Sequence, residues 1–481
     1  MNQPPLDGLC AEIGAVKKVH SIGRVTAVSD GYLTIDGLES EAKMGDRLCL
    51  NRHDGQEIEG EVLRLSSDSI SMLPDTSLDG IALDDRVSLL GEIGISPGDH
   101  WIGRVIDPFG RPLDGRPLVR GAKPRDLRNP PPEPSQRRGF GPRLDTGLSV
   151  LNTLLPIVQG QRVGLFAGSG VGKSSMIGHL AKDMQADVVV IALIGERGRE
   201  LRDFVHDTLG PEAMKRSVVV AATSDRSPLV RRRCAWVAMS VAEHFRDQGL
   251  QVLFLADSIT RFAEAHREVA IAGGEIPSMR GFPPSTAQMI MALCERAGPG
   301  SGLAGDITAL FSVLVAGSDM EEPIADILRG VLDGHVILDR QIAERGRFPA
   351  IDLLRSVSRS LPAAATDSEQ KLISETRQLL SAYEQAETMI KAGLYSKGSD
   401  PLTDHAIRAW PELDKFLAEP ERLGIDNSFA RLEILLRRAA RPDLAVGSPG
   451  PQSTGQRQLG GPMPSLPAIS QQKRNPNHIL Q

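Results

Sequence analysis

The sequence is poor in aromatic residues and cysteine, and it has no excess of basic charge. Of its 481 residues only 4% are aromatic, and the four cysteines are Cys10, Cys49, Cys234 and Cys294. These lie far apart without CxxC or His-rich spacing, which argues against a disulfide scaffold and a zinc site. Lysine and arginine total 55 against 61 acidic residues, a net charge of −6. The overall charge therefore gives no indication of DNA or RNA binding.

Long apolar runs are also missing. No stretch approaches the roughly 20 apolar residues that a membrane-spanning helix needs. Residues 1–7, MNQPPLD, lack the basic region followed by an apolar region that marks a signal peptide. We therefore expect a reduced, cytosolic protein.

The first part of the chain has the pattern of a small all-β domain. Short apolar segments, such as residues 61–65 and 86–90, alternate with turn dipeptides at Asp30-Gly31, Asp36-Gly37, Asp54-Gly55 and Asp79-Gly80. Regular turn signals at this spacing predict a β-barrel or sandwich over residues 22–98. Residues 120–142 are rich in proline and arginine and predict an extended connector.

The central part alternates continuous apolar runs with helix-length segments. The runs cover residues 162–167, 188–194, 218–222, 252–256 and 307–315. Such runs fit strands buried on both faces, so we predict an α/β domain with a parallel sheet over residues 99–367. Apolar residues at three- and four-residue spacing from Leu372 to Ile390 and from Phe429 to Leu436 predict a helical domain over 368–445. Residues 446–481, rich in Gly, Pro, Ser and Gln, predict a disordered tail.

The strongest chemical signal is a glycine-rich loop between a predicted strand and a predicted helix. It reads Ala167-Gly168-Ser169-Gly170-Val171-Gly172-Lys173-Ser174. Backbone N–H groups of such a loop surround phosphate oxygens at a helix N-terminus, the lysine bridges the β- and γ-phosphates, and the hydroxyl binds Mg²⁺. The alternative, a chance glycine-rich turn, does not account for the strand before the loop and the helix after it.

Two carboxylates end later strands of the same predicted sheet. Asp257 ends the run Val252-Leu253-Phe254-Leu255-Ala256, and Glu196 lies in Gly195-Glu196-Arg197-Gly198-Arg199-Glu200 after residues 188–194. Parallel sheets bind ligands at the carboxyl ends of their strands, where Asp257 is placed to hold a metal-bound water and Glu196 to polarise the attacking water. Taken alone, Asp257 is more typical of a helix cap or turn and Glu196 of a solvated charged loop. Their position at the same sheet edge as the phosphate loop favours the functional interpretation of both.

With these elements in this order, the sequence resembles the hexameric ATPases related to the catalytic β subunit of rotary ATP synthase. Further phrases resemble type III protein-export ATPases, and most closely the flagellum-specific group. These are Gly103-Arg104-Val105-Ile106-Asp107, Gly110-Arg111-Pro112-Leu113-Asp114-Gly115, Asp257-Ser258-Ile259-Thr260-Arg261-Phe262-Ala263, Gly281-Phe282-Pro283-Pro284-Ser285 and Ala316-Gly317-Ser318-Asp319-Met320-Glu321-Glu322-Pro323. The resemblance covers roughly residues 22–438. It implies a β-barrel, a RecA-like parallel-sheet core and a helical C-terminal domain.

The resemblance also implies roles for individual residues. Lys173, Glu196 and Arg359 would act in catalysis, with Arg197 and Arg261 organising the site, and Ser174 and, through water, Asp257 would hold Mg²⁺. Arg359 ends the segment Asp352-Leu353-Leu354-Arg355-Ser356-Val357-Ser358-Arg359, which the family uses to place an arginine finger in a neighbouring subunit's site. The ATP-binding residues would be Gly168, Ser169, Gly170, Val171, Gly172, Lys173, Ser174 and Ser175.

As for partners, the resemblance implies a homo-oligomer, expected to be a hexamer, at the inner face of the cell membrane. It would contact an export gate, chaperones, export substrates and a central stalk protein, and residues 1–21 would bind a stator-like regulator. Residues 393–401 lack the acidic cluster that rotary ATPases present to their stalk, which weakens an expectation of torque.

Three alternatives to a flagellar export ATPase stay open. One is the ATPase of a virulence-type injection system, which these motifs separate poorly from the flagellar one. The second is a ring ATPase acting on RNA like the Rho terminator, but residues 1–95 hold a single aromatic, Tyr32, so no nucleic acid is expected. The third is a noncatalytic nucleotide-binding subunit, which Glu196 disfavours because such relatives carry Gln there.

Overall fold

The computed structural model describes residues 19–29, 31–92, 94–278, 280–315 and 320–440, together with Gly8, Cys10, Ile13 and Gly14. The chain divides into two units, residues 1–440 and 441–481. Most of the predicted regulator-binding segment and all of the predicted tail lie outside the described residues. Among the helices that are described, none has the length and apolar character needed to cross a membrane.

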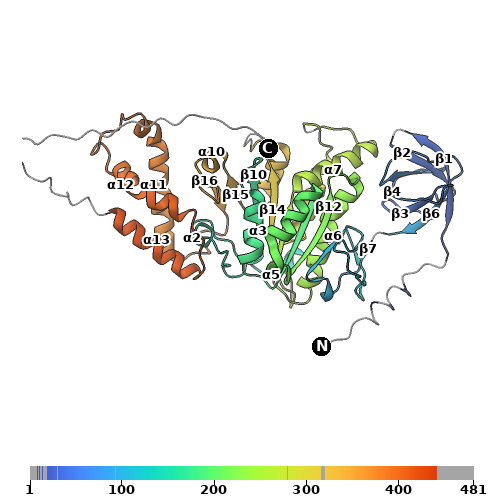
Figure 1. The fold of residues 1–481 in the computed structure, drawn as a ribbon, viewed down its shortest axis with the longest axis horizontal. Helices are drawn as coiled ribbons and strands as arrows, with labels where there is room; N and C mark the ends of the chain where they lie inside the picture. Colours follow the sequence, from blue (N-terminus) through green and yellow to red (C-terminus); the bar gives the residue numbers. More distant parts are fainter. Residues whose placement is uncertain are drawn as a thin grey trace, which may run out of the picture. The chain divides into compact units, whose positions relative to one another are not determined.

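The first domain is a closed six-stranded barrel, as the turn spacing predicted (Figure 1). Its strands pair in the order β1-β2-β5-β4-β3-β6, and β6 pairs with β1 to close the barrel. All of these pairs are antiparallel. Alternate residues such as Val25, Leu33, Leu48 and Ile70 point inward and are fully buried. The strands are β1 (Ile22–Ser29), β2 (Tyr32–Asp36), β3 (Arg47–Asn51), β4 (Glu57–Leu65), β5 (Ile70–Pro74) and β6 (Arg86–Gly91).

The central domain is an eight-stranded sheet in the order β16-β15-β10-β14-β13-β11-β12-β8. Every neighbouring pair is parallel except the edge pair β15–β16. The apolar runs predicted five of these strands, whereas β8, β15 and β16 were not anticipated. The strands are β8 (Arg104–Ile106), β10 (Arg162–Ala167), β11 (Val188–Glu196), β12 (Ser217–Thr223), β13 (Val252–Asp257), β14 (Ile307–Leu314), β15 (Gly334–Leu338) and β16 (Ile351–Ser358).

Helices cover both faces of this sheet. On one face α6 (Pro228–Arg246), α7 (Ile259–Ala272), α8 (Ser285–Glu295) and α9 (Pro323–Val331) bury apolar side chains against the strands. On the other face lie α2 (Ser149–Thr153) and α3 (Lys173–Asp183), joined by the C-terminal helices. Short elements complete the domain: β7 (Gly94–Ile95), β9 (Arg125–Asp126), α4 (Gly198–Asp203), α5 (Gly210–Met214) and α10 (Arg340–Glu344). The predicted connector, residues 120–142, holds β9 and the single 3₁₀ turn Pro134–Gln136.

The C-terminal domain consists of α11 (Asp367–Lys391), α12 (Pro401–Phe416) and α13 (Ile425–Ala440). The Thr366 side chain caps α11 in a capping box with Glu369, which explains why the helix begins there. The spacing of apolar residues predicted α11 and α13. Helix α12 was not predicted; it contains Pro411, a residue that normally ends a helix.

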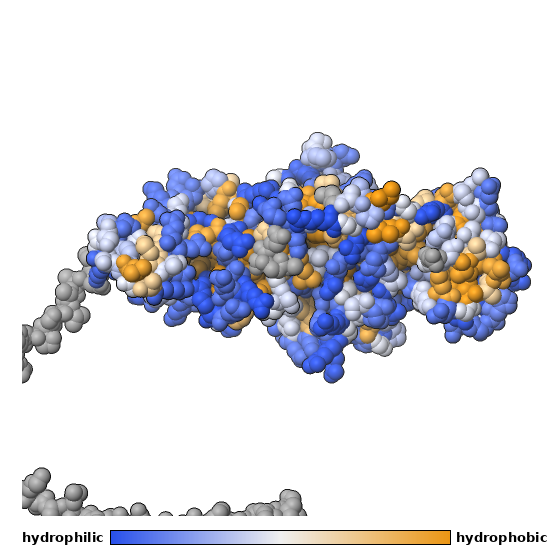
Figure 2. All heavy atoms as spheres, turned by 90° about the horizontal axis from the view of Figure 1, so that it is seen from above, coloured by the Kyte–Doolittle hydropathy of each residue, from blue (hydrophilic) through white to orange (hydrophobic). Residues whose placement is uncertain are grey.

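Figure 2 shows that the viewed face of the molecule is mainly hydrophilic, with apolar patches separated by polar surface. Single exposed apolar residues such as Leu303, Leu423 and Ile276 occur in different parts of the sequence. Scattered apolar residues of this kind are normal on soluble domains.

Candidate active site

The glycine-rich loop joins the end of β10 to the start of α3, in the context that the sequence predicted. Gly170 and Gly172 have φ values of 78° and 92°, a left-handed backbone that favours glycine. Helix α3 begins at Lys173, so the N–H groups of its first turn face the loop. A cavity of about 900 Å³ lies here, lined from this segment by Gly168, Ser169, Gly170, Gly172, Lys173, Ser174 and Ser175. The Val171 side chain is instead buried in the core.

Lys173 is held by two carboxylates. Its ammonium forms an ion pair with Asp257 and lies 3.9 Å from Oε1 of Glu196. The lysine side chain is only 11% exposed, so these carboxylates supply the counter-charge that a buried ammonium needs. The structure thus brings together the three residues that the sequence placed at separate strand and loop ends.

Asp257 is fixed from a second side. It ends β13, which runs parallel to β11 with Leu193 opposite Asp257. Its Oδ1 accepts a hydrogen bond of 2.8 Å from the Ser312 hydroxyl on β14. Ser312 was not predicted from the sequence, because a serine inside an apolar strand carries no local signal of function.

Glu196 stands where two carboxyl groups meet. Burial raises the pKa of Glu196 to about 7, and a hydrogen bond to Glu200 and repulsion by Asp257 act in the same direction. The hydrogen bond from Glu196 lowers the pKa of Glu200. Both residues line a smaller cavity of about 200 Å³ together with Ser174 and Asp257. Glu200 belongs to the same segment as Gly195-Glu196-Arg197, but the sequence did not predict that it contributes to the site.

Arg197 and Arg261 line the large cavity, and each forms an ion pair with a nearby glutamate. Arg197 is 80% exposed and lies 3.3 Å from Glu200. Arg261 is 44% exposed and lies 3.2 Å from Glu264. Both guanidinium groups are therefore available to a ligand in the cavity.

Arg359 lies beside the amino ends of the parallel strands, whereas the glycine-rich loop lies at their carboxyl ends. Strand β16 runs antiparallel to β15, so Ile351 pairs with Leu338, beside Ala167, while Ser358 pairs with Gly334. Arg359 is exposed and donates hydrogen bonds of 3.0 Å to the carbonyls of Leu332 and Arg329 at the end of α9. The structure does not bring Arg359 to the site of its own chain.

Phe348 is a further neighbour of the loop that sequence reasoning missed. A Cβ atom placed on Gly172 would lie 3.3 Å from Cδ1 of Phe348, and the phenylalanine is 51% exposed. A half-exposed aromatic ring next to a phosphate loop offers a face on which a planar ring can stack.

The residues present fit a nucleotide with Mg²⁺. The loop supplies backbone N–H groups and an ammonium for phosphates, and Ser174 and Asp257 supply oxygen atoms of the kind that Mg²⁺ prefers, directly or through water. In the described part of the chain no group of three or more His, Cys, Asp or Glu residues is arranged to hold a metal ion alone.

Comparison with known proteins places this geometry in a family. Residues 147–358 match the ATP synthase alpha/beta family, nucleotide-binding domain, and residues 365–433 match the T3SS EscN ATPase C-terminal domain. The chain is 41% identical to the flagellum-specific ATP synthase of Caulobacter vibrioides over 437 residues, which is 88% of this chain and 98% of that protein. The chain belongs to the flagellum-specific ATP synthase family. The relative from Salmonella typhimurium is likewise 41% identical, over 89% of this chain and 97% of that protein.

Solved structures agree with the family assignment. The assembled ATPase EscN of the enteropathogenic E. coli type III secretion system superimposes with a TM-score of 0.80 at 34% identity, covering 86% of this chain and all of that one. EscN in complex with its central stalk EscO gives a TM-score of 0.78. This chain is thus a P-loop ATPase of the type III export class. It has the barrel, the parallel-sheet core and the helical C-terminal region that its sequence predicted.

Proposed function

We propose that this chain hydrolyses MgATP in the flagellar export apparatus, as a ring at the cytoplasmic face of the export gate, to prepare and unload export substrates. The observation that carries the proposal is the convergence of Lys173, Glu196 and Asp257 on one cavity at the phosphate loop. A structural subunit has no need of a partly buried carboxylate at this position, whereas hydrolysis requires one to orient water.

Each residue then has a distinct task. Lys173 contacts the β- and γ-phosphates, and its release from Asp257 and Glu196 leaves those carboxylates free for metal and water. Ser174 and, through water, Asp257 would hold Mg²⁺, which would neutralise charge that develops on the phosphate oxygens. Glu196 accepts a hydrogen bond from the attacking water and orients it. Arg197 and Arg261 bind phosphate oxygens from the open side of the cavity, and Phe348 stacks on the adenine ring.

We further propose that the site is completed by a neighbouring copy of the chain. Arg359 lies at the end of the strands opposite to its own phosphate loop, so it can reach nucleotide only on another copy. The relative EscN has been described as an assembled ATPase and with a central stalk. By analogy, this chain forms a homo-oligomer, expected to be a hexamer, and contacts a central stalk protein.

The remaining partners follow from the family alone. The chain would associate peripherally with the inner face of the cell membrane, bind chaperones and export substrates, and use residues 1–21 for a stator-like regulator. The injectisome alternative is not better supported, because the curated relatives are named for the flagellum.

The proposal is tested by phosphate release from purified protein with ATP, across a protein concentration series. We expect turnover with Mg²⁺ that stops when the metal is chelated and that does not change on addition of RNA. Stimulation by RNA would favour the Rho-like alternative, and tight ATP binding without turnover at any protein concentration would favour a noncatalytic subunit.

A further inference from the structure

Strand β4 of the barrel is joined to helix α6 of the core by a buried ion-pair cluster. Glu61 on β4 is 2% exposed, with Oε1 2.6 Å from Nη2 of Arg233 and Oε2 3.0 Å from Nη2 of Arg232. The two arginine side chains are themselves only 4% and 7% exposed. One carboxylate therefore serves two adjacent buried guanidinium groups.

The same strand also caps helix α7. Arg64, three residues after Glu61, donates from Nε to the carbonyl of Gly273 at 2.8 Å and from Nη2 to that of Ala272 at 3.1 Å. Carbonyl groups at the end of a helix have no partners within the helix, and a cation there also suits the helix dipole. Strand β4 thus holds α6 near its beginning and α7 at its end.

These two helices meet the active site at the turn before Glu196. Gly195 has a φ of 69°, and a Cβ atom placed on it would lie 3.5 Å from Cδ of Arg231 on α6 and 3.5 Å from Cβ of Arg261 on α7. The helices are also joined to each other, because Arg231 binds Glu268 of α7 at 3.0 Å. The direction of the Glu196 side chain therefore depends on where α6 and α7 lie.

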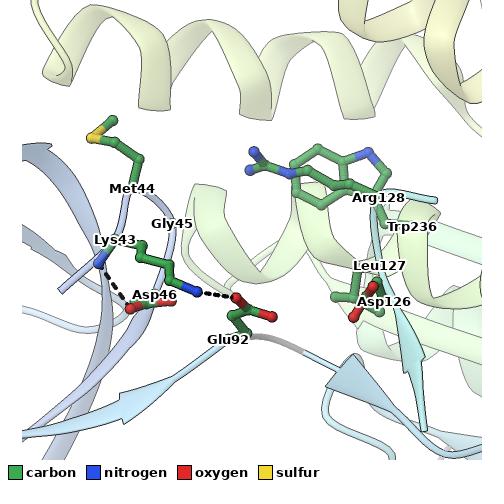
Figure 3. Close-up of a pocket in the computed structure, with 9 residues that line it drawn as sticks. All are labelled: Lys43, Met44, Gly45, Asp46, Glu92, Asp126, Leu127, Arg128 and Trp236. Atoms are coloured by element: carbon green, nitrogen blue, oxygen red, sulfur yellow. Dashed lines mark hydrogen bonds and ion pairs between the residues drawn. The ribbon is translucent and has the colours of Figure 1, made fainter. Parts of the chain in front are cut away.

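Next to the cluster a cavity of about 230 Å³ is lined by barrel residues 43–46 and Glu92 and by core residues 126–128 and Trp236 (Figure 3). In Figure 3 the guanidinium of Arg128 lies by the Trp236 ring, at 4.5 Å from its centroid. A cavity thus separates barrel and core at this place, whereas Glu61 and Arg64 of β4 make direct polar contacts with α6 and α7.

Removing Glu61 would take away the carboxylate that pairs directly with both buried guanidinium groups. Nε of Arg232 and both Nε and Nη1 of Arg233 already lack a hydrogen-bond partner. Unpaired buried charges are costly, so the two side chains would move apart or toward solvent and shift the first turns of α6. This part of α6 carries Arg231, whose Cδ would lie 3.5 Å from a Cβ atom placed on Gly195.

We propose that Glu61 and Arg64 are positioning residues for ATP hydrolysis, which hold Glu196 in its productive direction through helices α6 and α7. This inference rests on the proposed function of Glu196. The barrel domain would then contribute to the chemistry of a site that it does not touch.

The test measures single-turnover hydrolysis and ATP affinity on full-length Glu61→Gln and Arg64→Gln proteins. Because small displacements of a catalytic group cost large factors in rate, we expect the hydrolysis rate to fall by about tenfold or more for Glu61→Gln and by a smaller factor for Arg64→Gln. ATP affinity should fall by a smaller factor than the hydrolysis rate, because Lys173 and the loop are not displaced and only Arg261 moves with α7. Glu57→Gln, which removes an exposed carboxylate from the same strand, is the control and should leave the rate unchanged.

The same substitutions are then made in the Glu196→Gln background. If Glu61 and Arg64 act through Glu196, they should cause no further loss of the residual rate there. Equal fold-losses in both backgrounds, or a parental rate in Arg64→Gln, would overturn the inference. Arg64 is exposed, so that variant decides the matter even if Glu61→Gln fails to fold. Full activity of Glu196→Gln itself would overturn the proposed function, which is a different outcome.

Discussion

The ammonium of Lys173 lies 3.9 Å from the carboxylate of Glu196 and is paired with Asp257 at the same time. In the proposed mechanism the cation that binds phosphate is thus held by the two groups that serve water and metal. When phosphate oxygens replace these carboxylates as partners of Lys173, Glu196 and Asp257 would become free for their proposed tasks. The proposal therefore links substrate binding to the preparation of Glu196.

Lys173→Ala should lose nucleotide binding as well as turnover. The ammonium meets charge that is already present on ground-state ATP, so its removal weakens the complex before any chemistry. Titration calorimetry with ATP should show affinity reduced by at least about tenfold. Lys182→Ala, an exposed lysine on the same helix, is the matched control. Unchanged affinity in Lys173→Ala would contradict the assigned contact.

Glu196→Gln should stabilise the nucleotide-free protein at high pH. The folded state raises the pKa of Glu196 from 4.5 to about 7, so above pH 7 folding must keep a charge that burial disfavours. Glutamine removes this cost, and with discounting for the exposed part of the side chain we expect a gain of about 1 to 2 kcal/mol in unfolding free energy at pH 8. Below pH 4.5 the carboxyl is protonated in both states and the gain should vanish. Denaturant unfolding at the two pH values measures this, and an equal effect at both would be inconsistent with the shifted pKa.

Specific activity should rise with protein concentration if, as proposed, Arg359 acts only on another copy of the chain. Arginine fingers contribute on the order of 10³ to 10⁵ in rate. Mixing Arg359→Ala with Lys173→Ala chains should restore part of the activity that each lacks alone, since mixed interfaces pair an intact loop with an intact finger. A flat concentration profile without rescue in the mixture would refute the shared site.

Deletion of residues 1–18 should abolish capture of the regulator and spare basal ATPase activity. The sequence places Leu6, Leu9, Ile13 and Val16 at three- and four-residue spacing, which predicts a short amphipathic helix suited to a partner surface. Deletion of residues 446–481 should affect neither property strongly. Pull-down assays with both truncations provide the measurement, and undiminished capture by the N-terminally truncated protein would place the docking site elsewhere.

Much of this architecture could be predicted because burial leaves a local record in the sequence. Strand β11 reads as a run of apolar residues from Val188 to Ile194, and its burial on both faces is what such a run requires. The sequence pattern did not predict strands β8, β15 and β16. The exposed residues Arg355 and Val357 interrupt the apolar pattern of β16, because an edge strand is covered less completely than a central one.

The candidate site was predictable only where its residues follow a motif. Lys173 and Asp257 are 84 residues apart, and the rule that parallel sheets bind ligands at the carboxyl ends of their strands suggested that they meet. Ser312 and Phe348 reach the site through tertiary packing, which leaves no local pattern. The contacts of Glu61 and Arg64 with α6 and α7 likewise depend on how the barrel meets the core.

The central claim, that this chain is an ATPase in which Glu196 orients the attacking water, is tested most directly by comparing Glu196→Gln with the parental protein. Steady-state phosphate release and equilibrium ATP affinity should be measured on the same preparations. The account predicts that Glu196→Gln binds ATP with an affinity within about threefold of the parental protein while its turnover falls by at least about 10²-fold, because the carboxylate acts mainly in the transition state. Turnover at the parental rate in Glu196→Gln would contradict it.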